Sequence, residues 1–198
     1  MEIESFKTRI INLDSRKDRW EKIPSEMAKM RISDYERFQA IPGGSWASVS
    51  SHAEALKGVE GYLLLCEDDV VFLHQARDIF EKALTQIEGF DMIYLGGNIK
   101  APVFRCTENL FHLKGGTHTT HAIMYSEECR NKILDIYNYQ TNKISVYDHW
   151  LHCVGQEMFD TYMISPMVAY QSPGLSDCRG DYQDYFIDMR SNELYYMT

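Results

Sequence analysis

The feature that most constrains the fold is an apolar run that stops on three consecutive acids and then resumes. The run occupies Tyr62–Cys66, the acids occupy positions 67–69, and a second apolar stretch begins at Val70. A continuous apolar run of this length is typical of a strand buried on both faces, as in a parallel sheet covered by helices. In open α/β sheets, ligands bind beyond the carboxyl ends of the strands. The sequence therefore predicts an α/β fold with a ligand site where this strand ends.

The three acids, Glu67, Asp68 and Asp69, indicate the chemistry of that site. Their reference pKa values lie near ~4, so all three would be ionised at neutral pH and would repel one another. A divalent cation between them would remove this repulsion, since hard cations prefer carboxylate oxygens. The alternative is a surface turn with three solvated acids, which is a common structure. Such a turn does not usually lie between two strongly apolar runs, so we favour a cation site.

The composition is that of a globular protein that carries excess negative charge. The chain has 198 residues without an obvious repeat or low-complexity tract, so we expect one domain that spans residues 1–198. Its 29 acids outnumber its 20 Lys and Arg residues, which gives a formal net charge of −9. This charge disfavours nucleic acid as a partner, because binding a phosphate backbone requires a basic surface. A nucleotide can still bind through a local cation or a few arginines.

The cysteines and the N-terminus indicate the cellular compartment in which the protein is expected. The five cysteines are widely spaced, odd in number and lack a C-x-x-C pair, which predicts free thiols rather than a zinc site. The N-terminus lacks the basic and apolar regions of a signal peptide, and no window approaches the ~20 apolar residues of a membrane span. We therefore expect a soluble, cytoplasmic protein. Its oligomeric state is not predicted.

Apolar periodicity places strands and helices along the rest of the chain. Strands are expected at Arg9–Leu13, Tyr35–Ala40, Asp91–Leu95 and Tyr162–Gln171, the last with a break at Pro166, and a hairpin arm at Leu110–Lys114. Helices are expected at Lys17–Met30, Ala53–Lys57, His74–Ile87 and Glu127–Tyr139, with a further helix that opens within Ser145–His152. The segment from Cys178 to Thr198 is expected to wrap the surface or to cover a ligand.

Two arginines and one histidine are weaker candidates for ligand binding. Arg16 and Arg19 follow the first expected strand, where guanidinium groups suit a phosphate or a base edge. Taken alone, this turn favours arginines that are solvated or paired with nearby acids. His52 would lie in the first turn of a helix capped by a preceding serine, and such a histidine is more often a structural hydrogen-bonding group than a ligand.

Polar residues later in the chain could likewise be functional or only structural. Asp148 is expected in the first turn of a helix, where the helix dipole favours an anion without any catalytic role. His118 and His121 would share one face only on a helix, whereas the surrounding composition is typical of a strand. A zinc site at this pair is therefore not expected.

Taken in order along the chain, these motifs resemble glycosyltransferase family 25. That family includes lipopolysaccharide galactosyltransferases and the procollagen galactosyltransferase domain. One departure is that Ala47 and Ser48 stand where the family usually has Gly-Cys ahead of its Ser-His pair. The matching segments extend from about Arg9 to Asp177 and are Ile11–Arg19, Ser51-His52, Glu67–Val70, Thr120–Ser126, Val146–Asp148, Gln171 and Ser176-Asp177.

The resemblance implies a fold, a reaction and roles for residues. The implied fold is of GT-A type, with a mixed, mostly parallel central sheet flanked by helices. The implied reaction is an inverting transfer of galactose or glucose from a UDP-sugar to an acceptor hydroxyl, with Mn²⁺ or Mg²⁺ held by Asp69 together with Glu67 or Asp68. The base is implied to be Asp148, with Asp177 as the second choice. The residues implied to bind the donor are Asn12, Leu13, Arg16, Arg19, Ser51, His52 and Asp68.

Two other functions stay open. A non-catalytic module that binds a nucleotide sugar or a carbohydrate on the same fold is favoured by the departure at Ala47 and Ser48. A metal phosphohydrolase would account for the carboxylates but not for the Ser-His and Ser-Asp pairs. The acceptor is expected to be a glycan or a protein, and a modified nucleobase also stays open.

Overall fold

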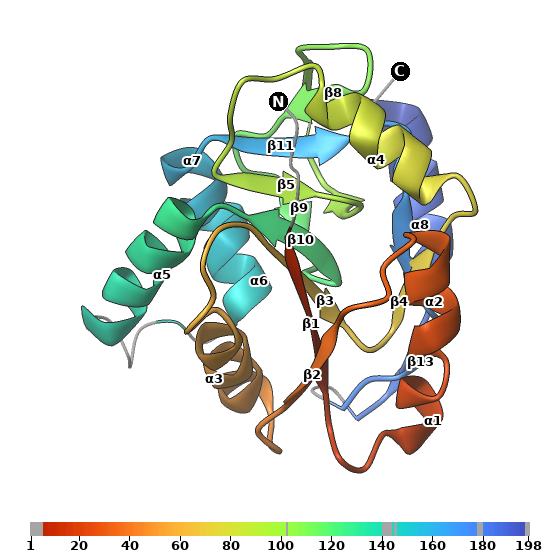
Figure 1. Ribbon diagram of the computed structural model, residues 1–198, viewed down its shortest axis with the longest axis vertical. Coiled ribbons are helices and arrows are strands. Elements are labelled where there is room, and N and C mark those ends of the chain that lie inside the picture. The colour runs from red at the N-terminus through yellow and green to blue at the C-terminus, as the bar shows by residue number, and fades with distance from the viewer. Residues whose placement is uncertain (1–5, 102, 140–143, 145, 178–179, 197–198) are drawn as a thin grey trace.

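The computed structural model describes residues 6–101, 103–139, 144, 146–177 and 180–196, and a mixed sheet is its central element (Figure 1). The strands of this sheet are β1 (Lys7–Asn12), β2 (Glu36–Gln39), β3 (Leu63–Glu67), β5 (Met92–Tyr94), β7 (Phe104–Arg105), β8 (Leu110–His112), β10 (Ala122–Tyr125) and β11 (Thr161–Ile164). Their order across the sheet is β2-β1-β3-β10-β5-β11-β8-β7. Strands β10 and β8 run against the other six, so the sheet is mixed and mostly parallel in direction. The expected α/β class is confirmed.

Three smaller antiparallel pairs complete the described strands. They are β4 (Val70–Phe72) with β12 (Ala169–Gln171), β6 (Asn98–Ile99) with β9 (Thr117–His118), and β13 (Gly174–Leu175) with β14 (Tyr182–Gln183). The strand expected at Tyr162–Gln171 is therefore two strands, β11 and β12, in different sheets. Pro166 lies between them and has no N–H to continue a ladder of hydrogen bonds.

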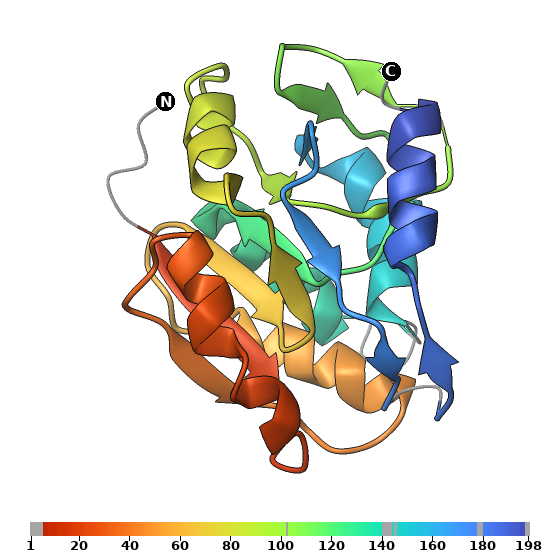
Figure 2. The same ribbon diagram turned by 90° about the vertical axis from the view of Figure 1, so that its right-hand side faces the viewer.

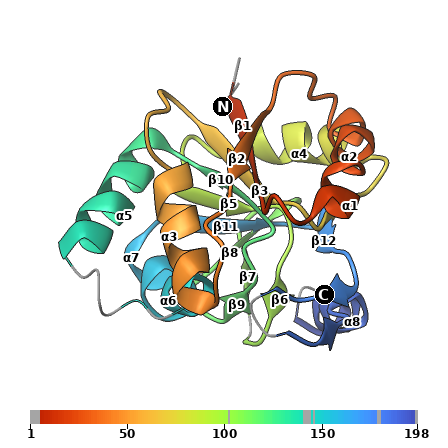
Figure 3. The same ribbon diagram turned by 90° about the horizontal axis from the view of Figure 1, so that it is seen from below.

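Helices cover both faces of the central sheet (Figures 1 and 3). One side carries α1 (Lys17–Trp20), α2 (Ile23–Lys29) and α4 (Ala76–Leu84). The other side carries α3 (Ser45–Ala55), α5 (Glu127–Tyr139), α6 (Tyr147–Trp150), the π-helical turn η1 (Leu151–Gly155) and α7 (Gln156–Met158). The last helix, α8 (Phe186–Tyr196), lies beside β12, and Figure 2 shows β4 and β12 between α2 and α8.

Strand β3 explains why the apolar run is continuous. Leu63 and Leu65 pack into the apolar cluster formed with α3, α5 and α6, whereas Leu64 and Cys66 pack into the cluster formed with α2 and α4. All four side chains are buried. Successive side chains of a strand point to opposite faces, so a strand between two helical layers needs apolar residues at every position.

Two expected helices differ from the observed ones in ways that the sequence explains. The helix expected at Lys17–Met30 is interrupted between Trp20 and Ile23, because Pro24 lacks an N–H and occupies the first turn of α2. The helix expected to begin at Ala53 begins instead at Ser45.

His52 therefore lies in the last turn of α3 and not in its first turn, which corrects the sequence-based expectation. The serines before it do not cap a helix but lie inside one. Ser51 Oγ donates to the Ala47 carbonyl oxygen at 2.8 Å, a back-bond that satisfies its hydroxyl within the helix. Val49 and Ala53 bury the apolar face of this helix.

Helix α8 was not expected from the sequence. Its anchor is Glu193, which is buried and accepts hydrogen bonds from the Met167 N–H at 2.6 Å and from the Tyr170 hydroxyl at 2.9 Å. Arg190 of the same helix contacts Glu193 at 2.8 Å. A buried carboxylate with three donors is satisfied, so this contact fixes the helix against β12.

Two further expectations concern the thiols and membrane spans. Cys66, Cys106, Cys129 and Cys153 carry free thiols, as expected, whereas Cys178 lies outside the described residues. Within the described residues, no helix has the length and apolar character needed to cross a membrane.

The close approach of two backbones at Gly96 gives a test of the fold. A Cβ at this position would lie 1.8 Å from the Ala169 carbonyl oxygen, so Gly96→Ala must displace β12. We expect Gly96→Ala to lower the free energy of unfolding by about 1–3 kcal/mol. Urea denaturation followed by circular dichroism measures this change.

The matched control is Gly89→Ala, because an added Cβ there meets no atom within 4 Å. It should change the free energy of unfolding by no more than about 0.5 kcal/mol. Equal stability of the two variants would contradict the described packing of β12.

Candidate functional site

The candidate site lies at one edge of the central sheet, where β1 and β3 both end. These strands are parallel, so Asn12 at the end of β1 and Glu67 at the end of β3 lie at the same edge, which Figure 3 views from below. Strand β10 runs antiparallel to β3, which brings the residues before its start, Thr120 and His121, to this edge as well. The acidic triplet is thus positioned as the sequence predicted.

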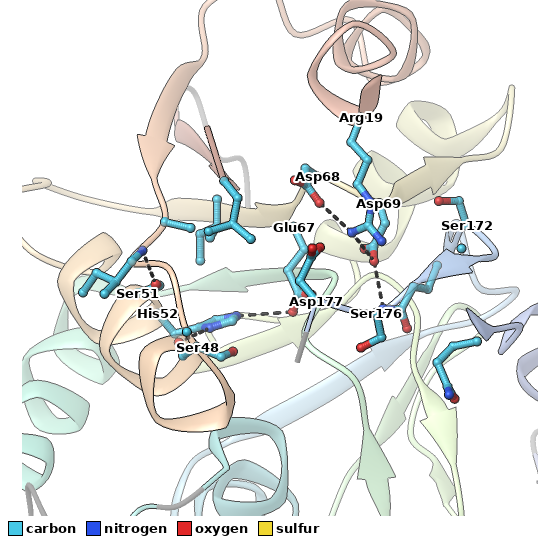
Figure 4. A pocket seen from close by; sticks show the side chains of 18 of the residues that line it. Arg19, Ser48, Ser51, His52, Glu67, Asp68, Asp69, Ser172, Ser176 and Asp177 are labelled. Carbon is cyan, nitrogen blue, oxygen red and sulfur yellow. Dashed lines mark hydrogen bonds and ion pairs between the residues drawn. The ribbon is translucent and has the colours of Figure 1, made fainter. Parts of the chain in front are cut away.

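A first cavity, of about 140 Å³, opens at this edge and collects most of the predicted donor-site residues. Figure 4 shows side chains converging on it from α1, from α3, from the end of β3 and from the segment after β12. The predicted residues that line this cavity are Leu13, Arg19, Ser51, His52, Glu67, Asp68, Asp69 and Asp177.

A second, larger cavity of about 660 Å³ adjoins the first. Asp148 lines the larger cavity and not the smaller one. Several polar side chains line the larger cavity, among them Lys100 and His118. The two cavities share the wall residues Ser48, Glu67, Gln171, Ser176 and Tyr185.

An arginine, and not solvent, faces two of the three acids. Arg19 Nη1 lies 2.8 Å from Asp68 Oδ1 and 3.1 Å from Asp69 Oδ2 (Figure 4). Its Nη2 donates to the Leu175 carbonyl oxygen at 2.9 Å. The Arg19 side chain is only 13% exposed, so this guanidinium neutralises part of a buried negative cluster.

Asp69 is the most deeply buried acid of the triplet, at 6% exposed. Its Oδ2 also accepts a hydrogen bond from Gln171 Nε2 at 3.0 Å, whereas its Oδ1 is buried and has no hydrogen-bond partner among the described residues. Burial and the charge of Glu67 raise the pKa of Asp69 to about 7, against the opposing effect of Arg19. A buried oxygen without a partner is costly, so Asp69 Oδ1 is available to a ligand.

Glu67 is held by a different set of groups. It accepts a short hydrogen bond from the Thr120 hydroxyl, and its Oε1 lies 3.3 Å from His52 Nε2. His52 Nδ1 must donate to the Ser48 carbonyl oxygen, 2.9 Å away, so a neutral ring would turn its Nε2 lone pair toward the Glu67 carboxylate. The protonated ring avoids this repulsion.

The pKa values of this pair shift accordingly. Burial opposes charge on both groups, but the contact with Glu67 raises the pKa of His52 above its ordinary value of 6.5. Burial likewise acts to raise the pKa of Glu67, and the contacts with His52 and Thr120 outweigh it and lower that pKa to about 2. Glu67 is therefore an ionised carboxylate at the wall between the two cavities.

Two predicted donor-site residues do not line either cavity. Asn12 donates to Asp68 Oδ2 at 2.6 Å and accepts from Arg37 Nε at 2.7 Å, so it orients an acid of the triplet. Arg16 pairs with Asp177 at 2.6 Å and also contacts Asp18 at 3.1 Å. Arg16 thus ties the segment after β12 to the turn after β1.

Sequence reasoning assigned no role to several residues that the structure places at the site. Gln171 reaches Asp69 only because β12 pairs with β4, and the sequence carries no local signal of that pairing. Thr120 holds Glu67 because β10 is antiparallel to β3. Tyr185, on the segment expected to cover a ligand, lines both cavities.

The acids fit a divalent cation only in part. In the portion of the chain that is described, no group of three or more His, Cys, Asp or Glu side chains is arranged to hold a metal ion. The side chains of Asp69 and Gln171 contact each other, and each has one buried oxygen, Oδ1 and Oε1, that has no hydrogen-bond partner in the described ranges. Mg²⁺-type cations often take one or two carboxylates and complete their coordination with water and substrate phosphates. The donor set suits a cation of that kind.

The His52–Glu67 pair predicts a pH dependence of stability. A raised pKa of His52 stabilises the folded state below pH 6.5, and this contribution is lost as the pH rises through the folded-state pKa. The lowered pKa of Glu67 adds stability above pH 4.5. The loss of stability in Glu67→Gln should therefore be largest between about pH 4.5 and 6.5.

Thermal unfolding across pH measures this difference, and the ring signals of His52 in NMR report its pKa directly. The His52 pKa should fall in Glu67→Gln and stay unchanged in Glu54→Gln, because the Glu54 side chain is 43% exposed and pairs with Lys57, just beyond the end of α3. A His52 pKa that is the same in wild type and Glu67→Gln would contradict the pairing.

Comparison with known proteins gives only distant likenesses. No protein-family model matches the sequence, and no curated protein matches it. Among solved structures, the chain is similar to A197 from STIV, with 14% identity, a TM-score of 0.48, and coverage of 89% of this chain and 92% of that one.

Two other likenesses are weaker still. An inositol-1-phosphate CTP transferase from T. maritima has 13% identity, a TM-score of 0.45, and coverage of 92% of this chain and 76% of that one. A glycosyltransferase involved in glycosylation of the major capsid of PBCV-1 has 9% identity, a TM-score of 0.40, and coverage of 75% of each chain. At these TM-scores the likenesses are distant, and the mixed, mostly parallel sheet flanked by helices is established by the strands and helices of the chain itself.

Proposed function

We propose that this chain is a glycosyltransferase that moves a hexose from a UDP-sugar to an acceptor hydroxyl with inversion and with the aid of Mn²⁺ or Mg²⁺. The observation that carries the proposal is the pair of adjoining cavities with a common wall. The smaller cavity presents an arginine and an acid pair, and the larger one presents Asp148. A transferase needs such an arrangement, because donor and acceptor must meet at one point.

In this proposal the smaller cavity takes the nucleotide diphosphate of the donor. Arg19 has the planar fork that binds phosphate oxygens, and Leu13 and Ile41 offer apolar contacts at the same cavity. Asp69, with Asp68, would hold the cation. When bound, the cation would neutralise charge on the departing diphosphate.

Asp148 is the preferred base for the acceptor hydroxyl. It lies in the first turn of α6 and lines the larger cavity, and no hydrogen bond or ion pair of its side chain is found within the described residues. Asp177 is less suited, because its Oδ2 already accepts a hydrogen bond from Arg16 at 2.6 Å. A base must have a free oxygen within hydrogen-bond reach of the proton that it removes.

The acceptor class and the family belong to the same proposal. A wide cavity with hydroxyl, amide and carboxylate walls suits a glycan or a protein hydroxyl. The order of motifs makes glycosyltransferase family 25 the family that we propose. We also propose that residues 1–198 act as one catalytic domain in the cytoplasm.

A second function is favoured by one observation. Arg19 already neutralises Asp68 and Asp69, so the site can bind a nucleotide sugar through this guanidinium without a metal or any turnover. A non-catalytic nucleotide-sugar or carbohydrate-binding module would need no more than this.

A thermal-shift screen tests the donor site. A ligand that binds only the folded state at 100 times its Kd adds about 2.7 kcal/mol of stability. We expect one UDP-sugar to raise the unfolding temperature by several degrees in the presence of Mn²⁺. Asp69→Asn should abolish this shift, since it removes an anionic oxygen that faces the cation.

The control is Asp34→Asn, because the Asp34 side chain is 91% exposed and its ion pair, with Lys7, lies outside the site. This variant should keep the full shift. If no nucleotide sugar stabilises the folded wild-type protein, with or without Mn²⁺, the proposed function is wrong.

Asp148→Asn separates the enzyme from the binding module. For an enzyme, the variant should keep donor affinity but lose about 10²–10⁴-fold in transfer rate, as removal of a general base predicts. Isothermal titration with the UDP-sugar and a radiolabelled transfer assay measure the two quantities. Saturable donor binding by the wild type without transfer to any glycan or protein acceptor would favour the binding module.

A further inference from the structure

We infer that Arg19 competes with the divalent cation for Asp68 and Asp69. A bound nucleotide diphosphate removes this competition, because its phosphates bind the guanidinium in place of the two carboxylates. The inference rests on the proposed function, because it describes how the same site binds its cation and its nucleotide. It predicts that the cation binds weakly alone and more tightly with the nucleotide.

The contacts of Arg19 are the first argument. One nitrogen, Nη1, serves both Asp68 Oδ1 at 2.8 Å and Asp69 Oδ2 at 3.1 Å. A divalent cation that approached these oxygens would meet the positive charge of this nitrogen. The cation and the guanidinium therefore cannot both occupy the acid pair at full strength.

The groups left without a partner are the second argument. Asp69 is more than nine-tenths buried, yet within the described part of the chain neither its Oδ1 nor the buried Gln171 Oε1 has a hydrogen-bond partner. Arg19 thus satisfies one oxygen of Asp69 and leaves the other unsatisfied. A single guanidinium is an incomplete partner for this cluster, and two buried oxygens point to a further positive ligand.

Arg19 also lies where its guanidinium could move from the acids to a bound phosphate. Its Nη2 contacts the Leu175 carbonyl oxygen, so the guanidinium bridges the acids and the segment after β12. All of these groups except Leu175 line the smaller cavity. A phosphate in that cavity would offer Arg19 a bidentate partner of higher charge than either carboxylate. Binding of one ligand then favours the other, and this coupling is reciprocal.

The test uses Mn²⁺ alone as the probe, with UDP as the second ligand. Electron paramagnetic resonance measures the free aqueous Mn²⁺ and so gives its affinity for each variant. In Arg19→Met, which keeps the length of the side chain and removes its charge, the affinity for Mn²⁺ without nucleotide should rise about tenfold, within the usual range of coupling between sites. The factor by which UDP tightens Mn²⁺ binding should shrink in this variant.

Arg31→Met is the control, because Arg31 pairs with Asp78 at 2.7 Å and both side chains are more than half exposed. Neither residue lines the two cavities of the site. The affinity of this variant for Mn²⁺ should equal that of the wild type. Arg19→Lys retains a positive charge that protects the fold but lacks the fork, so its affinity should fall between those of wild type and Arg19→Met.

Several outcomes would overturn the inference. An affinity for Mn²⁺ in Arg19→Met and Arg19→Lys that is equal to or weaker than that of the wild type would show that Arg19 does not compete. Absence of Mn²⁺ binding in all folded variants would show that the acids are no cation site. A UDP-sugar that still stabilised the protein without metal would then leave the proposed donor site standing, so the two failures are distinguishable.

Discussion

Three carboxylates at the end of one buried strand must be kept apart or neutralised, and the rest of the site is arranged around this requirement. Glu67 contacts His52 and Thr120, whereas Asp68 and Asp69 pair with Arg19. Each cation comes from a different element, since His52 lies on α3 and Arg19 on α1. The charge of the triplet thus fixes how helices from both sides of the sheet meet its edge.

This division of partners gives the acids different chemical roles. The contacts with His52 and Thr120 keep Glu67 ionised at the wall between the cavities. Asp69 has a raised pKa and one buried oxygen that has no hydrogen-bond partner among the described residues, so it differs from Glu67 in both respects. Asp148 lines the larger cavity, and its side chain has no such partner within the described residues, which is the property that the proposed base requires.

The sequence predicted the parts of this account that depend on local patterns. The unbroken apolar run of β3 predicted burial on both faces, and the acids after it predicted a need for positive charge. The identity of that charge could not be predicted, because Arg19 and Asp69 meet only through the turn after β1. Gln171 lies 102 positions from its partner Asp69 and depends on the β4–β12 pairing. The early start of α3 was missed because serines were expected to cap the helix, whereas Ser51 bonds its hydroxyl to a carbonyl oxygen inside it.

The central claim is that the acidic turn is the place where cation and nucleotide diphosphate meet. Anomalous X-ray scattering from crystals grown with Mn²⁺ and UDP tests it most directly, because the manganese signal is independent of the interpretation of the surrounding density. The account predicts a manganese peak beside Asp69, with the diphosphate next to it and Arg19 moved from the acids to the phosphates. Nucleotide bound with manganese elsewhere on the chain, and Arg19 still paired with Asp68 and Asp69, would contradict it.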